Sequence, residues 1–191
     1  MKKILLLALA LGLLISAPAA AATVEDVDGA LGVSLGWFQV DDETETYATI
    51  GAAGVDFDAA LSFGLDYSWY VDEGTRAWNL AFLYSKPDVA TTGAAAGWSG
   101  DATVWQLSVN HLWYVSTMDA GPHKGWYLGA GLGYGSVDVS LANAAGTSVS
   151  ADDSTLDINA LVGYEWACGG HADLLWVVDE SNLGLSMGYR F

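Results

Sequence analysis

Residues 181–191, SNLGLSMGYRF, end the chain with an alternating pattern. The odd-numbered positions from 183 onward are apolar or aromatic, and the even-numbered positions are small or polar. Successive side chains of a β-strand point to opposite faces, so this stretch predicts a strand with one apolar face and one polar face. The apolar face ends in Met187, Tyr189 and Phe191.

Seven earlier segments repeat this two-residue period, and turn-rich stretches separate them. Each segment is near the length of about 9–11 residues that a tilted membrane strand needs. We therefore predict eight antiparallel strands. The seven earlier segments are Gly29–Val40, Ala60–Val71, Trp78–Tyr84, Trp105–Tyr114, Trp126–Gly135, Leu156–Trp166 and His171–Trp176.

The connections between the segments differ in length. Long connections, expected as loops, cover about residues 41–58, 86–101 and 140–153, whereas short turns follow the second and sixth segments. In transmembrane barrels the long loops are extracellular and the short turns are periplasmic, which assigns a side to each connection. The short turn at 179–180 departs from this pattern, and so does the long connection after the fourth segment.

The N-terminal residues have the pattern of a secretory signal peptide. Lys2 and Lys3 precede an apolar run from Ile4 to Ile15, and small residues follow as far as Ala22. The apolar run is too short to span a membrane as a helix. We expect a signal peptide at residues 1–22 and one domain at residues 23–191.

Composition excludes several classes of protein. The chain has 6 basic and 23 acidic residues; without the two signal lysines four basic residues remain, for a net charge of −19, which excludes nucleic-acid binding. The single cysteine, Cys168, excludes an intramolecular disulfide. About half of the chain (52%) is hydrophobic, yet no later apolar run approaches the length of a spanning helix. A membrane protein of this kind must be a closed barrel, because backbone polar groups in lipid must all be paired.

Tryptophan placement supports a membrane barrel. Eight of the nine tryptophans fall on the apolar parity near strand ends, and Trp98 falls in a predicted loop. Two aromatic girdles around an apolar band are typical of a lipid-facing surface. The alternative, a soluble lipocalin-like barrel with its apolar face inward, would need charged residues on the other face, which here is Gly, Ser and Asn. The predicted girdle residues are Trp69, Trp78, Trp113, Trp126 and Trp166 at the periplasmic end, and Trp37, Trp105 and Trp176 at the extracellular end.

With these features the chain resembles the small eight-stranded outer-membrane β-barrels of the OmpA/OmpX/OmpW-like, opacity-type porin superfamily. The resemblance rests on the signal, the strand count, the stretch GWYLGAGLGYG (residues 125–135) and the Tyr-Arg-Phe end. It implies an all-β up-and-down barrel in the outer membrane of a Gram-negative bacterium, in contact with lipid and lipopolysaccharide, and without a cofactor. It also implies that Met187, Tyr189 and Phe191 are recognised by the barrel-assembly machinery. We expect no peptidoglycan-binding domain after Phe191.

The strand parity places a set of polar side chains in the lumen, which in a barrel of this size is just wide enough for side chains. The tight turn 167–169 would set Glu165 opposite His171, and the next turn would set His171 opposite Gly188, so we expect Glu165, His171 and Arg190 to meet at the periplasmic mouth. Two hypotheses follow, a proton-sensitive gate or a satisfied polar core. The predicted inward residues are Asp66, Gln106, Asn110, Asp157, Asn159, Glu165, His171, Asp173 and Arg190.

Three functions are compatible with this pattern. The first is a structural or surface-interaction barrel with a mostly plugged lumen, and the second is a narrow channel for small or hydrophobic solutes. The third is a lipid A-modifying enzyme, since lipid A deacylases resemble this chain in a histidine near the seventh strand. Their nucleophile is a serine two residues later, where this chain has Asp173, so we predict that it is not an enzyme.

The connection at 41–58 is rich in acid. Carboxylate clusters suit divalent cations, but Asp41, Asp42, Glu43 and Glu45 lack the spacing of a known calcium loop. A solvated run of charge is the alternative interpretation, and we predict no metal site.

Overall fold

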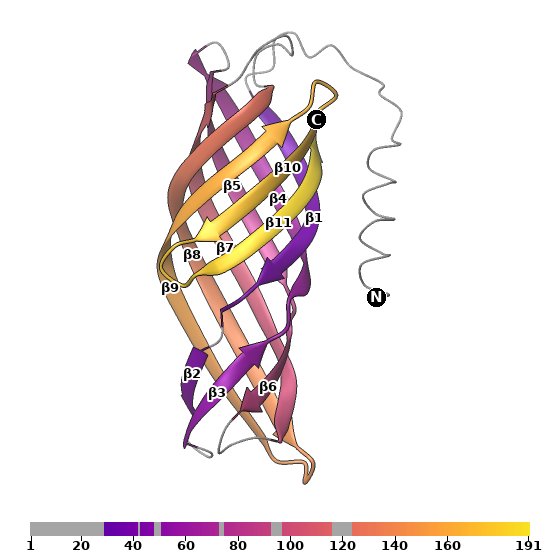
Figure 1. Cartoon of the computed structure of the whole chain (residues 1–191), viewed down its shortest axis with the longest axis vertical. Coiled ribbons are helices and arrows are strands. Elements are labelled where there is room, and N and C mark those ends of the chain that lie inside the picture. The colour runs from indigo at the N-terminus through magenta and orange to yellow at the C-terminus, as the bar shows by residue number, and fades with distance from the viewer. Residues whose placement is uncertain (1–28, 42, 48–50, 73–74, 93–96, 116–123) are drawn as a thin grey trace.

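The computed structural model describes residues 29–41, 43–47, 51–72, 75–92, 97–115 and 124–191, with 43–47 and 51–53 as backbone only (Figure 1). The expected signal peptide lies outside these residues. Within the described ranges no helix is long and apolar enough to cross a membrane. The strands are β1 (Gly29–Gln39), β2 (Glu43–Tyr47), β3 (Gly51–Phe57), β4 (Ala60–Val71), β5 (Arg76–Ser85), β6 (Asp88–Thr92), β7 (Trp98–Tyr114), β8 (Gly125–Asn143), β9 (Ser148–Glu165), β10 (Gly170–Val177) and β11 (Asn182–Arg190).

Eight strands close into an antiparallel barrel in the order β1-β4-β5-β7-β8-β9-β10-β11. The last strand returns to the first, with Tyr189 opposite Val33 and Met187 opposite Leu35. Beyond β11, Phe191 and Leu31 exchange backbone hydrogen bonds of 2.9 and 3.1 Å. Closure pairs both edges of the wall, as a lipid environment requires. The predicted fold, an all-β, eight-stranded antiparallel up-and-down barrel, is confirmed.

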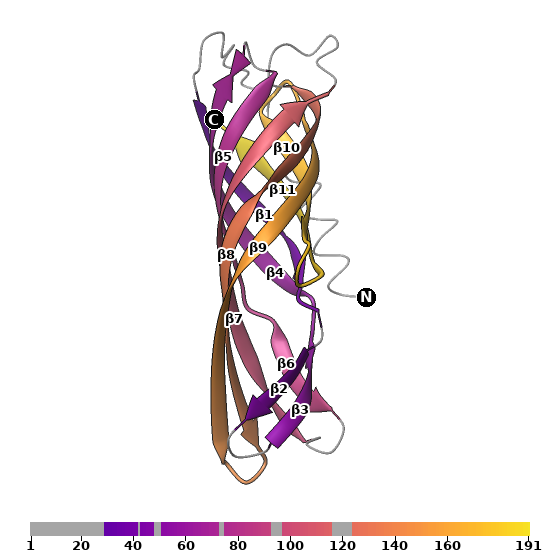
Figure 2. The same cartoon turned by 90° about the vertical axis from the view of Figure 1, so that its left-hand side faces the viewer.

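Three barrel strands continue beyond the others. β7, β8 and β9 are 17, 19 and 18 residues long, well above the predicted length. The short strands β6, β3 and β2 add to the edge of β7 in that order. Figure 2 shows these six strands leaving the barrel at the end opposite the C-terminus. We call this part the extension; it comprises β2, β3, β6, and residues 98–104 of β7, 136–143 of β8 and 148–155 of β9.

The prediction that the three long connections are loops is therefore wrong. Residues 41–58 contain β2 and β3, residues 86–101 contain β6 and the start of β7, and residues 140–153 contain the ends of β8 and β9. Trp98, expected in a loop, begins β7 and packs against the core of the extension. The physical reason is that the two-residue period does not stop at the predicted strand ends.

The extension has an apolar core of its own. It forms because alternate residues of β1, β3, β6, β7, β8 and β10 point inward, and these residues are aliphatic or aromatic. Burying such side chains stabilises the fold by roughly 1.5–3 kcal/mol each. The core continues into the barrel as far as β1 and β10. Its buried members are Phe38, Val40, Val55, Phe57, Val89, Ala102, Val104, Val139, Leu141 and Val177.

Candidate functional site: the lumen of the barrel

One rung of the barrel wall carries a charged pair. Gly32 of β1 lies opposite both Asp66 of β4 and Arg190 of β11. Because Gly32 has no side chain, the Asp66 carboxylate occupies the space where a Cβ would lie. The Arg190 guanidinium reaches across β1, and its Nε donates to Asp66 Oδ2 at 3.0 Å. The two side chains are only 4% and 10% exposed, so the pair lies inside the lumen.

Glu165 of β9 is the second carboxylate that Arg190 contacts, and its side chain is fully buried. Arg190 Nη1 donates to Glu165 Oε2 at 2.8 Å, and the Tyr114 hydroxyl donates to the same oxygen at 3.0 Å. Lys124 Nζ donates to Oε1 at 2.6 Å. Three donors therefore satisfy one buried carboxylate, which otherwise would be costly to bury. We call Asp66, Tyr114, Lys124, Glu165 and Arg190 the lumen cluster.

His171 lies beside the lumen cluster and not within its hydrogen bonds. The predicted register is confirmed, since His171 is opposite Glu165. The His171 side chain, however, lies beside Asp173 of the same strand, β10, with its Nε2 3.6 Å from Asp173 Oδ2. The Tyr127 hydroxyl donates to the other oxygen of Asp173. Of the three residues expected to meet, Glu165 and Arg190 are in contact, whereas His171 is grouped with Asp173 and Tyr127.

The middle of the lumen is lined by amides and hydroxyls. Asn79 Nδ2 donates to Asp66 Oδ2 at 2.9 Å, which ties this zone to the lumen cluster. Asn110 Nδ2 donates to Ser108 Oγ at 3.1 Å, and Gln106 Nε2 donates to Asn159 Oδ1 at 3.2 Å. The glycines of β8 face these amides and leave room for them.

A cavity of about 70 Å³ lies between this zone and the lumen cluster. Asn110, Asp173 and Arg190 are among its lining residues. Nearby, Asn110 Oδ1, Asn159 Nδ2 and His171 Nδ1 are buried without a hydrogen-bond partner among the described residues. A cavity of this size has room for a few water molecules, which would hydrogen-bond to polar lining groups such as Asn110.

Asp157 is the one predicted charged residue of the lumen that lies far from the lumen cluster. It lines a second cavity, of about 40 Å³, at the boundary with the extension. Phe38, Val104 and Val177 also line this cavity and belong to the apolar core. The lumen is thus closed by charged pairs at one end and by apolar packing at the other.

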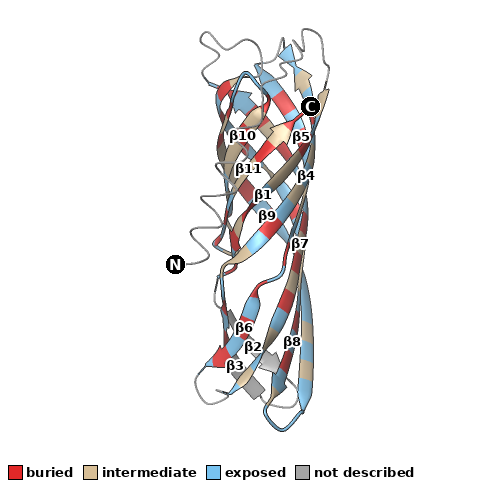
Figure 3. Cartoon of the chain, turned by 90° about the vertical axis from the view of Figure 1, so that its right-hand side faces the viewer, coloured by how far each residue is buried: buried red, intermediate tan, exposed pale blue. Residues whose placement is uncertain are grey.

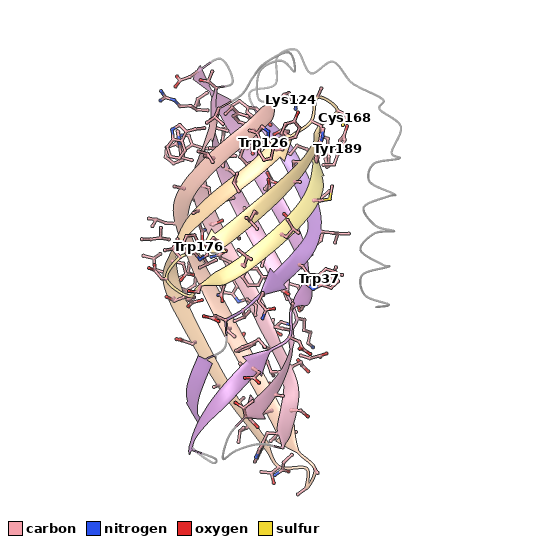
Figure 4. All side chains as sticks on the ribbon, in the orientation of Figure 1. Trp37, Lys124, Trp126, Cys168, Trp176 and Tyr189 are labelled. Carbon is pink, nitrogen blue, oxygen red and sulfur yellow. The ribbon has the colours of Figure 1, made fainter. Side chains whose placement is uncertain are left out.

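The predicted girdle residues lie on the outer face in two groups. Figure 4 places Trp126 and Tyr189 near the C-terminal end of the molecule, and Trp37 and Trp176 near its middle. The register sets Trp69 beside Trp78, and Trp126 beside Tyr164. The second group is not at an end of the molecule because the extension continues beyond it.

Two members of this region were not predicted. Lys124 directly precedes β8, and Gly125 is opposite Glu165, so the lysine side chain can reach the carboxylate. Tyr127 shares the inward parity of the β8 glycines and is fully buried. Two signals were available in the sequence: Lys124 is a basic residue two positions before the predicted strand at 126–135, and Tyr127 is a large residue on its glycine-rich face.

The acidic stretch 41–58 is only partly described. Asp56 and Asp58 are exposed, while Asp42 and the side chains of Glu43 and Glu45 lie outside the described residues. Among the side chains that are described, no three potential metal ligands converge.

No family model matches this chain, and no curated protein matches it by sequence. The attachment invasion locus protein Ail of Yersinia pestis, in complex with the heparin analogue sucrose octasulfate, aligns with a TM-score of 0.60 and 16% identity. The alignment covers 86% of this chain and 100% of Ail. Neisserial surface protein A (NspA) aligns with a TM-score of 0.55 and 12% identity, over 86% of this chain and 96% of NspA.

The chain has the fold of the eight-stranded outer-membrane β-barrels. Ail and NspA align along essentially their whole lengths, so the likeness covers the complete barrel. Identities of 12–16% relate the folds and leave the role of this barrel to its own residues.

Proposed function

We propose that this protein is a structural or surface-interaction barrel of the Gram-negative outer membrane, with a lumen that is mostly plugged. The observation that carries the proposal is the closure of the lumen at both ends. Charged pairs close one end, and the apolar core of the extension closes the other. Between them the lumen has cavities of about 70 and 40 Å³, room for water but not for a continuous solute path.

The outer face supports the membrane location. Leu132 and Leu185 are more than half exposed, and other large apolar side chains surround them. Contact of such an apolar surface with lipid tails carries no free-energy penalty, whereas its exposure to water does. In this orientation the lumen cluster is periplasmic and the extension is extracellular. Phe191, which is 63% exposed at the barrel seam, with Tyr189 and Met187, is the proposed contact of the assembly machinery.

The charge of the extension indicates the kind of surface partner. Ail is seen with a sulfated heparin analogue, a polyanion. In this protein the described part of the extension and its surroundings has one basic residue, Lys86. Lys86 Nζ forms an ion pair with Asp101 Oδ1 at 3.0 Å. The hydrogen bond from Lys86 to Asp101 raises the pKa of the lysine. Exposed acids dominate the remaining surface, so we expect neutral or cationic partners and lipopolysaccharide bridged by divalent cations. The exposed acids include Asp56, Asp58, Asp88, Asp101, Asp138, Asp152 and Asp153.

A planar-bilayer recording tests the plug. The refolded native protein is expected to give little steady conductance. Glu165→Ala removes the acceptor shared by Arg190, Tyr114 and Lys124 and should raise the conductance. The matched control is Asp101→Ala, which removes an exposed ion-paired carboxylate of the extension and should change nothing.

The alternative function is a narrow channel, which the water-sized cavity beside Asn110 favours. A large and stable conductance in the native protein would support the channel and reject the plug. We propose no enzymatic role, because the residue two positions after His171 is Asp173, which cannot replace an activated serine. Unchanged lipid A by mass spectrometry after co-expression is the expected result.

A further inference from the structure

A histidine on the outer face is held between two tryptophans. His111 of β7 lies opposite Trp78 of β5, and Trp113 follows two residues later on the same face. The His111 ring centre is 4.7 Å from that of Trp78 and 4.4 Å from that of Trp113. Within the barrel part of β7, residues 105–113, the outward side chains other than His111 are all apolar or aromatic, so the place of this imidazole among the girdle residues needs a reason.

The imidazole has an unmet polar requirement. His111 Nδ1 is buried without a hydrogen-bond partner among the described residues. On the other side of His111 the opposite residue is Ala130 of β8, whose side chain is small and exposed. His111 itself is partly exposed whereas its Nδ1 is buried, so a group from outside the protein would meet the ring on the side that carries Nε2.

An arginine lies one rung closer to the end of the barrel. Arg76 is opposite Trp113 and shares the outward parity of Trp78. Its side chain is 53% exposed, and Nη1 forms an ion pair with Asp72 at 3.2 Å. An exposed pair of this kind is weak, and a guanidinium has five N–H donors, so Arg76 can still bind an anion.

We propose that Arg76, Trp78, His111 and Trp113 form a binding site for the phosphate group of a phospholipid in the periplasmic leaflet. Arg76 supplies the charge, His111 Nε2 donates a hydrogen bond, and the two indoles contact the upper part of the acyl chains. The proposal rests on the proposed membrane orientation, in which the start of β5 and the end of β7 are periplasmic. Phospholipid is chosen over lipopolysaccharide because the latter occupies the opposite leaflet.

The test uses the full chain, refolded in detergent and titrated with phosphatidylglycerol, with bound lipid counted by native mass spectrometry. Arg76→Gln should weaken lipid binding about tenfold, the loss of one charge-assisted hydrogen bond. His111→Phe keeps an aromatic ring between the tryptophans and should weaken binding about fivefold. The matched control is Lys86→Gln, which removes an exposed, ion-paired basic residue near the extension and should leave binding unchanged.

Each outcome decides the proposal. Native-like lipid binding in both Arg76→Gln and His111→Phe, or an equal loss in Lys86→Gln, overturns it. Competition by inorganic phosphate as strong as by the lipid would assign the site to a free anion instead. Folding is followed separately by heat-dependent gel mobility and by insertion into liposomes. Failure of the native protein to insert would reject the proposed membrane function, whereas inserted variants with unchanged lipid binding would reject this site alone.

Discussion

Strand β8 passes through two regions that bury opposite kinds of residue. Its even-numbered side chains face outward along the whole strand, and its odd-numbered side chains face inward. In the barrel the outward residues include Leu132, which is 57% exposed. The inward ones are Tyr127 and glycines, of which Gly131 and Gly133 face polar side chains. In the extension Ser140 faces outward and Val139 inward, only 4% exposed. Figure 3 shows the alternation of buried and exposed residues along the long strands.

The two regions of β8 differ in the medium around them and not in their backbone geometry. The pleat of a strand dictates that alternate residues share a face, and it does so equally in both regions. The medium outside decides which face is apolar: lipid around the barrel, in the proposed orientation, and water around the extension. A single strand can therefore cross the membrane boundary without any change of direction. Only the character of its outward face changes, from apolar as far as Tyr134 to mostly polar from Ser136 onward.

The largest expected effect is at the polar interior of the barrel. Arg190→Ala leaves Asp66 and Glu165 buried without their main partner, which should cost about 3–5 kcal/mol of unfolding free energy. Urea unfolding in liposomes, followed by tryptophan fluorescence, measures it. Lys86→Ala, which breaks an exposed pair, should leave the stability nearly unchanged. A small effect of Arg190→Ala would mean that water reaches the pair and that the lumen is wetter than the comparison assumes.

The outer face gives the next effect, with two positions on one strand. Leu132→Arg places a charge on the lipid face and should destabilise the barrel by about 2–4 kcal/mol if it lies near the midplane. Ser140→Arg, eight residues later on the same face, should change stability by less than about 0.5 kcal/mol, because it faces water. The same urea titration compares them. Equal costs would show that lipid and water do not divide β8 where its polarity reverses.

The smallest effect is expected inside the extension. Val139→Ala removes buried methyl groups from its apolar core and should cost about 2 kcal/mol. The loss should be local, so limited proteolysis should cut the β8–β9 hairpin faster while the heat-dependent gel mobility of the barrel stays native. Ser140→Ala, the outward neighbour, is the control. A barrel destabilised to the same extent would show that the two regions unfold as one unit.

The sequence by itself determined the barrel. The two-residue period predicted which face each residue occupies, and the short turns predicted the register of β9, β10 and β11, so that Glu165 faces His171. The pairing of the last strand with the first followed from an even number of strands that must close in lipid. These features are local or topological, and hydrophobic patterning and turn length specify them directly.

Tertiary structure decided the partners and the extension. Arg190 and Asp66 are 124 residues apart, and they meet only because Gly32 leaves a gap between their strands. Lys124 reaches Glu165 from outside a predicted strand. The extension escaped prediction because an alternating stretch with a polar outer face resembles a loop until its inward residues have something to pack against. Contacts between side chains on neighbouring strands exist only once the sheet has assembled. The same holds for the buried core that β7, β8 and β9 form together, so neither feature can be read from a single segment.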